Sequence, residues 1–350
     1  MNIPSSLTPL IGDDLLLQTK RQINKAHKIV IITHLSPDGD AMGSSLGLYH
    51  YLFDRGKDVR VIVPNAFPYF LKWMNGSDNI VINTYIPTVA EQIIKHSDLI
   101  FCLDFNTLKR IGDLAVNVEQ ASAHKILIDH HLLPDPDFDV LISYPHISST
   151  SEIVFRLLLQ MGEFDKITPV IAECIYTGMM TDTGGFTYNS NEPEIFVIIS
   201  LLIKKGVDRD VVYNQVSNNY NEQRFRLLGF TLSQRMNIYP ESRSSLIYLS
   251  KEDQMQFIIS KGDTEGFVNY PLSIKDIVFS AFIREDDQMV KISLRSQGDF
   301  PCNEFASEYF NGGGHLNASG GEFYGEIEDA ISLFEIGLEK YDDKLKNTVI

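Results

Sequence analysis

The chain has 350 residues, of which 44% are hydrophobic and 22% are charged, a size and composition that predict two globular domains in a soluble protein. Its longest apolar stretches, such as residues 197–203, fall short of a membrane span, and its first residues lack a leader pattern, so we expect a cytoplasmic protein. Three separated cysteines argue against a disulfide framework, and a net charge of −16 argues against binding long nucleic acid, although small anions remain admissible.

The first half of the chain predicts parallel strands joined by helices. Runs rich in β-branched residues alternate there with amphipathic segments, a pattern typical of a doubly wound α/β domain. We assign this domain to residues 1–188. The expected strands are residues 28–33, 58–63, 79–83, 98–103, 124–128 and 139–143, and the expected helices are residues 41–53, 89–96 and 108–119.

The second half predicts a helical linker followed by a smaller α/β domain. Helical periodicity extends from residue 151 to about residue 236, and we take residues 189–236 as the linker. Strand-like runs then resume and define a C-terminal domain over residues 237–350. Its expected elements are strands at 245–250, 277–284 and 289–294, a helix at 303–310, a glycine-rich loop and a last helix near 327–340.

Ionisable side chains follow three of the predicted strands. In an open parallel sheet, ligands bind outside the carboxyl ends of the strands, so residues that follow separate strands can converge on one crevice. A histidine and carboxylates cannot be buried cheaply there unless they are paired or bound to metal. The residues are His34, Asp38 and Asp40 after the first strand, Asp104 after the fourth, and Asp129, His130 and His131 after the fifth.

A fourth carboxylate site strengthens the case for divalent cations. Asp182 follows a predicted helix and precedes two glycines that permit close backbone approach. Together with Asp38, Asp40 and Asp104 it brings four negative charges, which two divalent cations would balance. Oxygen and nitrogen ligands suit Mn²⁺, Mg²⁺ or Fe²⁺, and two such ions activate water and hold a phosphoryl oxygen. Taken alone, the Asp-Gly-Asp turn is equally well a loop whose aspartate caps the next helix.

Four motifs occur in order within residues 28–188, namely THLSPDGDAMGS, LDFN, IDHH and TDTGGF. Together they resemble the four motifs of the DHH phosphoesterase superfamily. The resemblance implies a two-metal site, most readily for Mn²⁺ with Mg²⁺ as the alternative. One metal would be held by His34 and Asp38, the other by Asp40, His130 and Asp182, with Asp104 between them.

The same resemblance gives the remaining two motif residues catalytic roles. Asp129 would orient the imidazole of the ligand His130, because a ligand histidine usually needs a carboxylate partner. His131 would face the substrate phosphate or the leaving group. The alternative for His131 is a core histidine packed behind the site, since adjacent side chains on a strand face opposite ways.

A second signal lies in the glycine-rich segment 311–321. Consecutive glycines let backbone N–H groups approach an anion, although flexible hairpins have similar sequences. With the helix at 303–310 and an Arg-Ser pair, the segment resembles the DHH-associated C-terminal domain, which implies phosphate binding. Arg110, after Asp104, either reaches the same cleft or is a solvated helix arginine. The implied substrate contacts are Arg295, Ser296, Gly313, Gly314 and His315.

The serine-rich segment 148–152 predicts an N-terminal cap for a helix at 153–159. Its hydroxyl groups and the helix N-terminus are also candidates for a phosphate contact.

Within the superfamily, the resemblance favours the short two-domain enzymes. The glycine-rich loop argues against family II pyrophosphatases, and the chain has no room for the extra domains of RecJ-type exonucleases or for the spans of membrane-bound phosphodiesterases. We expect hydrolysis of short oligoribonucleotides, or nanoRNA, and of 3'-phosphoadenosine 5'-phosphate (pAp). The alternatives are a soluble phosphodiesterase for linear or cyclic dinucleotides and a binding module without catalysis. A dinucleotide oxidoreductase is disfavoured because no G-x-G-x-x-G follows the first strand. A homodimer is implied by the resemblance alone.

Overall fold

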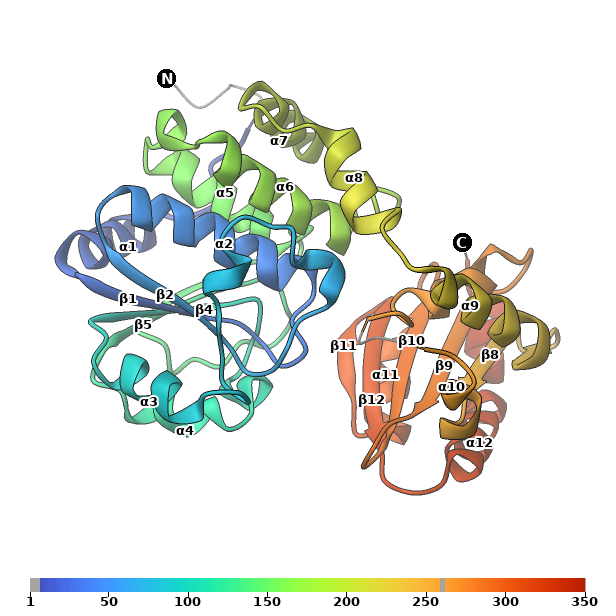
Figure 1. The fold of residues 1–350 in the computed structure, drawn as a ribbon. Coiled ribbons are helices and arrows are strands. Elements are labelled where there is room, and N and C mark those ends of the chain that lie inside the picture. The colour runs from blue at the N-terminus through green and yellow to red at the C-terminus, as the bar shows by residue number, and fades with distance from the viewer. Residues whose placement is uncertain (1–6, 259–261, 350) are drawn as a thin grey trace. The chain divides into compact units, whose positions relative to one another are not determined.

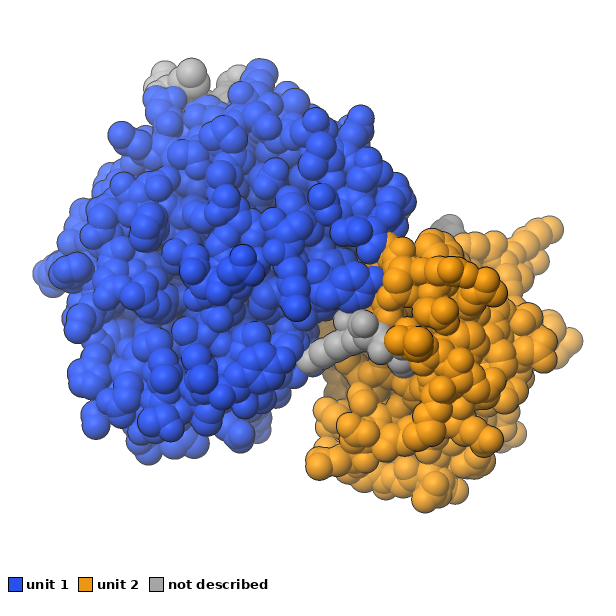
Figure 2. All heavy atoms as spheres, in the orientation of Figure 1, with its two compact units in different colours: residues 1–219 blue, residues 220–350 orange. Residues whose placement is uncertain are grey.

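The computed structural model describes residues 7–258 and 262–349, so the outermost ends of both predicted domains lie outside the described residues. The chain divides into two compact units, residues 1–219 and residues 220–350 (Figure 2). The residues of the predicted linker, 189–236, form two helices of the first unit and one helix of the second. A separate linker therefore remains a prediction. Among the described residues, no helix combines the length and hydropathy that crossing a bilayer requires.

The first unit is built on a six-stranded parallel sheet, as predicted. Its strand order is β3-β2-β1-β4-β5-β6, and every pair of neighbours is parallel. The order reverses between β1 and β4, which is where ligands bind in doubly wound sheets. The strands are β1 (Lys28–Ile32), β2 (Asp58–Val63), β3 (Val81–Ile82), β4 (Leu99–Leu103), β5 (His124–Asp129) and β6 (Val140–Ser143).

Helices cover both faces of this sheet (Figure 1). Two of them, α3 and α4, pack on one face against the β-branched side chains of β1 and β4. On the other face lie α1, α2 and α5, and α6 packs against α2 and α5. The helices are α1 (Asp13–Lys25), α2 (Gly39–Asp54), α3 (Pro87–Lys95), α4 (Leu114–Gln120), α5 (Thr150–Gln160), α6 (Pro169–Asp182), α7 (Pro193–Lys204) and α8 (Arg209–Ser217).

The second unit is a mixed six-stranded sheet with helices on both faces, in the order β11-β12-β10-β9-β8-β7. The pair β8 and β9 is parallel and the other pairs are antiparallel. Alternate residues of β9 face opposite cores: Ala281 and Ile283 pack with α11 and α12, whereas Phe282 packs with α9. The elements are α9 (Glu222–Gln234), β7 (Met236–Tyr239), β8 (Ser244–Leu249), α10 (Lys251–Met255), β9 (Phe279–Glu285), β10 (Val290–Ser296), α11 (Cys302–Tyr309), β11 (Gly313–His315), β12 (Ala318–Phe323) and α12 (Ile327–Asn347).

The predicted glycine-rich loop is wrong as a loop, because its residues form the hairpin of β11 and β12. Glycine has low strand propensity, which hid this hairpin in the sequence. The glycines are needed for close packing: a methyl group on Gly312 would lie 2.0 Å from the carbonyl oxygen of Gly320. Strand β7 and helix α1 were also absent from the predicted elements.

Glycines on one face of α2 let this helix pack closely against α6. A methyl group on Gly43 would lie 2.6 Å from both the carbonyl oxygen of Cys174 and the amide nitrogen of Gly178 in α6. Closely packed interiors have no room for such an overlap. The contact brings the first turn of α2, with Asp40, beside the last turn of α6, with Asp182. The glycines of this face are Gly39, Gly43 and Gly47, spaced four residues apart.

This packing predicts the effect of adding one methyl group. We expect Gly43→Ala to lower the midpoint of thermal unfolding by about 2–10 °C, because overpacking costs about 1–3 kcal/mol in a domain of this size. Gly229→Ala in α9 is the matched control, since its methyl group would meet nothing within 4 Å and alanine favours a helix. Scanning calorimetry measures both. Equal stability of Gly43→Ala and the wild type would contradict the close contact.

Candidate metal centre

The candidate centre lies at the carboxyl ends of β1, β4 and β5, on both sides of the point where the strand order reverses. His34 follows β1 and Asp104 follows β4, so these two residues leave adjacent strands. Asp38 caps the N-terminus of α2: its Oδ1 accepts hydrogen bonds from the backbone N–H groups of Asp40 and Ala41 at 3.0 and 3.1 Å. Its Oδ2 lies 3.9 Å from Nε2 of His34. The cap and the cluster therefore use different oxygens of the same carboxylate.

Asp104 occupies the middle of the cluster. Its backbone has a φ of 65°, a left-handed conformation that aspartate tolerates better than most residues. The side chain is buried. Its Oδ2 lies 3.4 Å from Nε2 of His34, and its Oδ1 lies 3.6 Å from Nε2 of His130. One carboxylate thus faces two imidazoles that come from different strands.

Asp40, His130 and Asp182 form a second group around the same carboxylate. Nε2 of His130 lies 3.6 Å from Asp182 Oδ2 and 4.0 Å from Asp40 Oδ2. The other ring nitrogen, Nδ1, donates to the carbonyl oxygen of Ile147 at 3.1 Å. A backbone carbonyl in this position fixes the tautomer of a ligand histidine and leaves Nε2 as the ligand atom. The role of Ile147 was not predictable from the sequence, because any residue can supply a backbone carbonyl.

The partner of Asp129 differs from the expected one. Its Oδ1 lies 2.6 Å from Nδ1 of His131, and the carboxylate is fully buried. Asp129 therefore orients His131, while His130 is oriented by the backbone. His131 does not follow the alternation of side chains along a strand, since β5 ends at Asp129. His131 is 13% exposed and lies beside Asp104, so it belongs to the cluster and not to the core behind it.

The spacing of these atoms suits divalent cations. Two ligand atoms held about 2.1 Å from one octahedral ion lie about 3 Å apart when adjacent and about 4 Å apart when opposite. The Nε2 atoms of His34 and His130 lie 3.4 to 4.0 Å from the neighbouring oxygens of Asp38, Asp40, Asp104 and Asp182. Among the groups of three described residues whose ligand atoms lie within 4.8 Å of one another, two match the predicted division of the ligands. These groups are His34, Asp38 and Asp104, and Asp40, His130 and Asp182.

Burial and mutual repulsion shift the pKa values of the clustered side chains. Burial raises the pKa of Asp40 well above its usual range, and the charges of Asp104 and Asp182 raise it further. Partial burial raises the pKa of Asp182 to about 6, to which the charge of Asp38 contributes. Burial alone would lower the pKa of His130, but the neighbouring carboxylates raise it to about 9. A divalent cation would replace this proton and relieve the repulsion among the carboxylates.

The predicted substrate residues of the second unit lie on one sheet. Arg295 of β10 and His315 of β11 both pair with Ala318 of β12, which lies between them. Paired residues in neighbouring strands share a face of the sheet. The two side chains therefore leave the same face from strands about 10 Å apart, since neighbouring strands are separated by about 4.8 Å. Between them, Ala318 contributes only a methyl group.

Ser296 has a structural role in place of the predicted phosphate contact. Its hydroxyl is buried, donates to the carbonyl oxygen of Phe300 at 2.7 Å and accepts from Asn317 at 2.9 Å. The two predicted glycines, Gly313 and Gly314, also differ in their packing. A methyl group on Gly314 would lie 2.6 Å from the carbonyl oxygen of Ala318, whereas Gly313 has no atom within 3.8 Å of that position. Gly313 is thus less closely packed than Gly314 at the position of a side chain.

Arg110 lies in a short 3-10 helix (Leu108–Ile111) next to the first unit's cluster. Its carbonyl oxygen accepts a hydrogen bond from the backbone N–H of Leu35 at 2.8 Å. Burial lowers the pKa of His34, but the hydrogen bond that its imidazole donates to Asp104 and the charge of Asp38 raise this pKa above its usual value. The positive charge of Arg110 opposes this rise. The side chain is half-buried, so it is not a fully solvated arginine.

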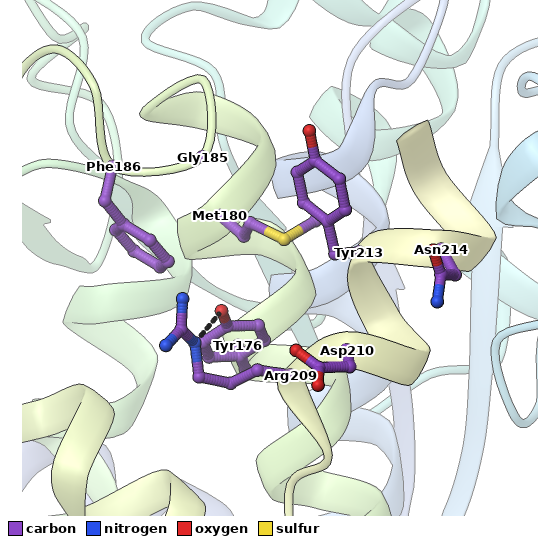
Figure 3. Close-up of a pocket in the computed structure, with 8 residues that line it drawn as sticks. All are labelled: Tyr176, Met180, Gly185, Phe186, Arg209, Asp210, Tyr213 and Asn214. Carbon is purple, nitrogen blue, oxygen red and sulfur yellow. Dashed lines mark hydrogen bonds between the residues drawn. The ribbon is translucent and has the colours of Figure 1, made fainter. Parts of the chain in front are cut away.

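A hollow of about 320 Å³ lies on the other side of α6 (Figure 3). Tyr176 and Met180 of α6, Phe186 of the following loop and Arg209 of α8 contribute to its wall. Nε of Arg209 donates to the hydroxyl of Tyr176 at 3.0 Å, and the rings of Tyr176 and Phe186 lie 5.6 Å apart. None of the predicted site residues lines this hollow. The contacts of Tyr176 with Arg209 and Phe186 instead join the last turns of α6, which ends at Asp182, to α8 and the following loop.

Comparison with known proteins accounts for both halves of the chain. Residues 28–179 match the N-terminal domain of the DHH family, and residues 245–339 match the DHHA1 domain. The bifunctional oligoribonuclease and PAP phosphatase NrnA of Thermus thermophilus is 30% identical over 318 residues, which cover 91% of this chain and 90% of that protein. The chain belongs to the DHH family of phosphoesterases. It is a hydrolase, and the predicted family and enzyme class are confirmed.

Two further similarities place this DHH protein among known members. A solved structure described as an exopolyphosphatase-related protein from Bacteroides fragilis is 56% identical, with a TM-score of 0.94 over 97% of this chain and 100% of that one. The cyclic-di-AMP phosphodiesterase GdpP of Bacillus subtilis is 25% identical over 334 residues, which cover 92% of this chain but 49% of that protein. The two sheets described above confirm the predicted fold class, a doubly wound α/β domain followed by a smaller α/β domain.

The raised pKa of His130 predicts proton release when a cation binds. At pH 7.5 the imidazole is protonated, because its pKa is about 9, whereas a metal ligand must be neutral. We expect a titration with Mn²⁺ to release about one proton or more per chain, and the affinity to fall as the pH is lowered. Calorimetry in two buffers of different ionisation enthalpy measures the release.

The matched variants are His130→Asn and His124→Asn, the latter at an exposed residue that pairs with Asp139. His130→Asn should reduce the proton release, and His124→Asn should leave it unchanged. Equal heats in both buffers for the wild type would contradict the prediction.

Proposed function

We propose that this DHH phosphoesterase uses two divalent cations to hydrolyse phosphate esters in short oligoribonucleotides and in pAp. His34 and Asp38 would hold one cation, Asp40, His130 and Asp182 the other, and Asp104 would bridge them. Mn²⁺ is the preferred ion and Mg²⁺ the alternative, since the ligands are oxygen and nitrogen atoms without thiolate. The two groups of convergent ligand atoms support this division.

In this proposal the side chains bind the cations, orient the catalytic imidazole and contact the substrate phosphate. When bound, the cations provide an activated nucleophile and stabilise negative charge on the phosphoryl oxygens. Asp129 fixes the ring of His131, which contacts the phosphate or the oxygen of the leaving group by hydrogen bonding. Arg295 and His315, together with the backbone of Gly313, bind a substrate phosphate from the second unit.

The coverage of NrnA is the observation that carries this choice of substrate. The similarity extends over 91% of this chain and 90% of that relative, so it includes both the cluster and the sheet that bears Arg295 and His315. GdpP supports the second candidate, a phosphodiesterase for linear or cyclic dinucleotides, but the chain spans about half of its length. Both candidates share one reaction and differ in the nucleotide bound. A cytoplasmic location and a homodimer remain predictions.

A panel of substrates distinguishes the candidates. Purified protein with Mn²⁺ or Mg²⁺ would be offered pAp, RNA of two to five residues, cyclic dinucleotides and pyrophosphate. We expect the highest kcat/KM on short RNA and pAp. Preference for a cyclic dinucleotide would favour the second candidate, and preference for pyrophosphate would overturn both.

Removal of one carboxylate tests whether the cluster is catalytic. We expect Asp40→Asn to lower kcat by about a thousandfold or more, because cation-based charge stabilisation contributes several kcal/mol. Asp54→Asn is the matched control: Asp54 is the exposed last residue of the same helix, about 21 Å from Asp40 along the axis. Its activity should equal that of the wild type. Normal hydrolysis by Asp40→Asn would refute the two-cation proposal.

A change in the second unit separates substrate binding from cation binding. We expect Arg295→Ala to raise KM by about tenfold or more, since hydrogen bonds to charged groups contribute about 1.5–3 kcal/mol. Its metal content, measured by elemental analysis, should not change. Arg226→Ala, at an exposed arginine that pairs with Glu222 on α9, is the control. An unchanged KM for Arg295→Ala would remove Arg295 from the substrate contacts.

A further inference from the structure

The N-terminus of α5 is directed at the cluster and is already occupied by an anion of the protein itself. Backbone N–H groups of Thr150 and Ser151 donate to the two oxygens of Asp40 at 2.6 and 2.9 Å. All three residues are buried. Ser149 is the N-cap and accepts from the N–H of Glu152 at 3.1 Å. The donors that could have bound a substrate phosphate here are therefore used on Asp40.

Thr150 makes a second contact through its side chain. Its hydroxyl donates to Oδ1 of Asp104 at 2.9 Å, and this is the oxygen that lies 3.6 Å from Nε2 of His130. One residue thus bonds two carboxylates, Asp40 through its backbone and Asp104 through its hydroxyl. A hydroxyl has one hydrogen to donate, so this bond fixes its direction.

Buried contacts hold this end of α5 in place. Glu152 accepts from the hydroxyl of Ser148 at 2.6 Å and from Nε of Arg156 at 2.8 Å. Arg156 also reaches Glu194 of α7 at 2.8 Å. On the other side, a methyl group on Gly178 of α6 would lie 1.9 Å from the hydroxyl oxygen of Ser151, so α6 packs directly against the first turn of α5. The backbone of Thr150 cannot shift without breaking these contacts.

We propose that Thr150 is a positioning residue that holds Asp40 and Asp104 at a fixed separation, so that both cations bind tightly. It touches neither the substrate nor the reacting atoms, and it acts through the two carboxylates. The inference rests on the ligand roles proposed for Asp40 and Asp104. Repulsion between the two buried carboxylates would otherwise favour their separation before the first cation enters. Groups that orient metal ligands in this way change metal affinity by about 10- to 100-fold when they are removed.

Three variants test this role by calorimetric titration with Mn²⁺. Thr150→Val keeps the shape of the side chain and removes the hydroxyl, and we expect the affinity for at least one of two cations to fall by about 10-fold or more. Thr150→Ser retains the hydroxyl and should restore wild-type affinity. Thr231→Val is the control, because the hydroxyl of Thr231 is buried in α9 and donates to the carbonyl of Leu227 in its own helix.

The measurements separate positioning from a merely structural role. Thermal unfolding of the cation-free variants would be recorded beside each titration, and Thr150→Ala replaces Thr150→Val if the latter does not fold. A variant without the hydroxyl that is less stable but binds Mn²⁺ like the wild type would overturn the role of Thr150. Wild-type protein that binds no cation would instead overturn the proposed function.

Discussion

Repulsion among buried carboxylates is the constraint on which this site depends. Asp40 and Asp104 are almost fully buried within a few ångströms of each other's charge, and Asp182 raises the crowding further. Such a group is unstable unless positive charge or N–H donors face each oxygen. The N-terminus of α5 and two imidazoles supply part of this compensation. Divalent cations would supply the rest, which is why the ligand geometry and the electrostatics lead to the same conclusion.

The fold brings these groups together through two kinds of contact. Parallel pairing of β1 with β4 places His34 and Asp104 at neighbouring strand ends, where the strand order reverses. Close helix packing brings Asp40 beside Asp182, because Gly43 allows α2 to touch the backbone of α6. A sheet alone would hold the first pair and leave the second apart. The arrangement of the cluster therefore depends on glycine in a helix as much as on the charged residues.

The gathering of these residues in one cluster was predictable from the sequence, whereas their hydrogen-bond partners were not. His34, Asp104 and His130 follow apolar runs, and parallel strands bring such ends together whatever the details of packing. Asp129 could not be assigned to His131 in advance, because the choice between adjacent histidines depends on where β5 ends. The hairpin of β11 and β12 was hidden for another reason: glycine has weak strand propensity, and its use here is close contact between backbones.

The two units fix the positions of their polar side chains in different ways. In the first unit, separate hydrogen bonds from Thr150 hold the carboxylates of Asp40 and Asp104. In the second, sheet register fixes Arg295 and His315 as a pair on either side of Ala318, and the spacing belongs to the strands. A division of this kind allows the same hydrolytic centre to serve different nucleotides, which accounts for the shared reaction and distinct substrates of relatives such as NrnA and GdpP.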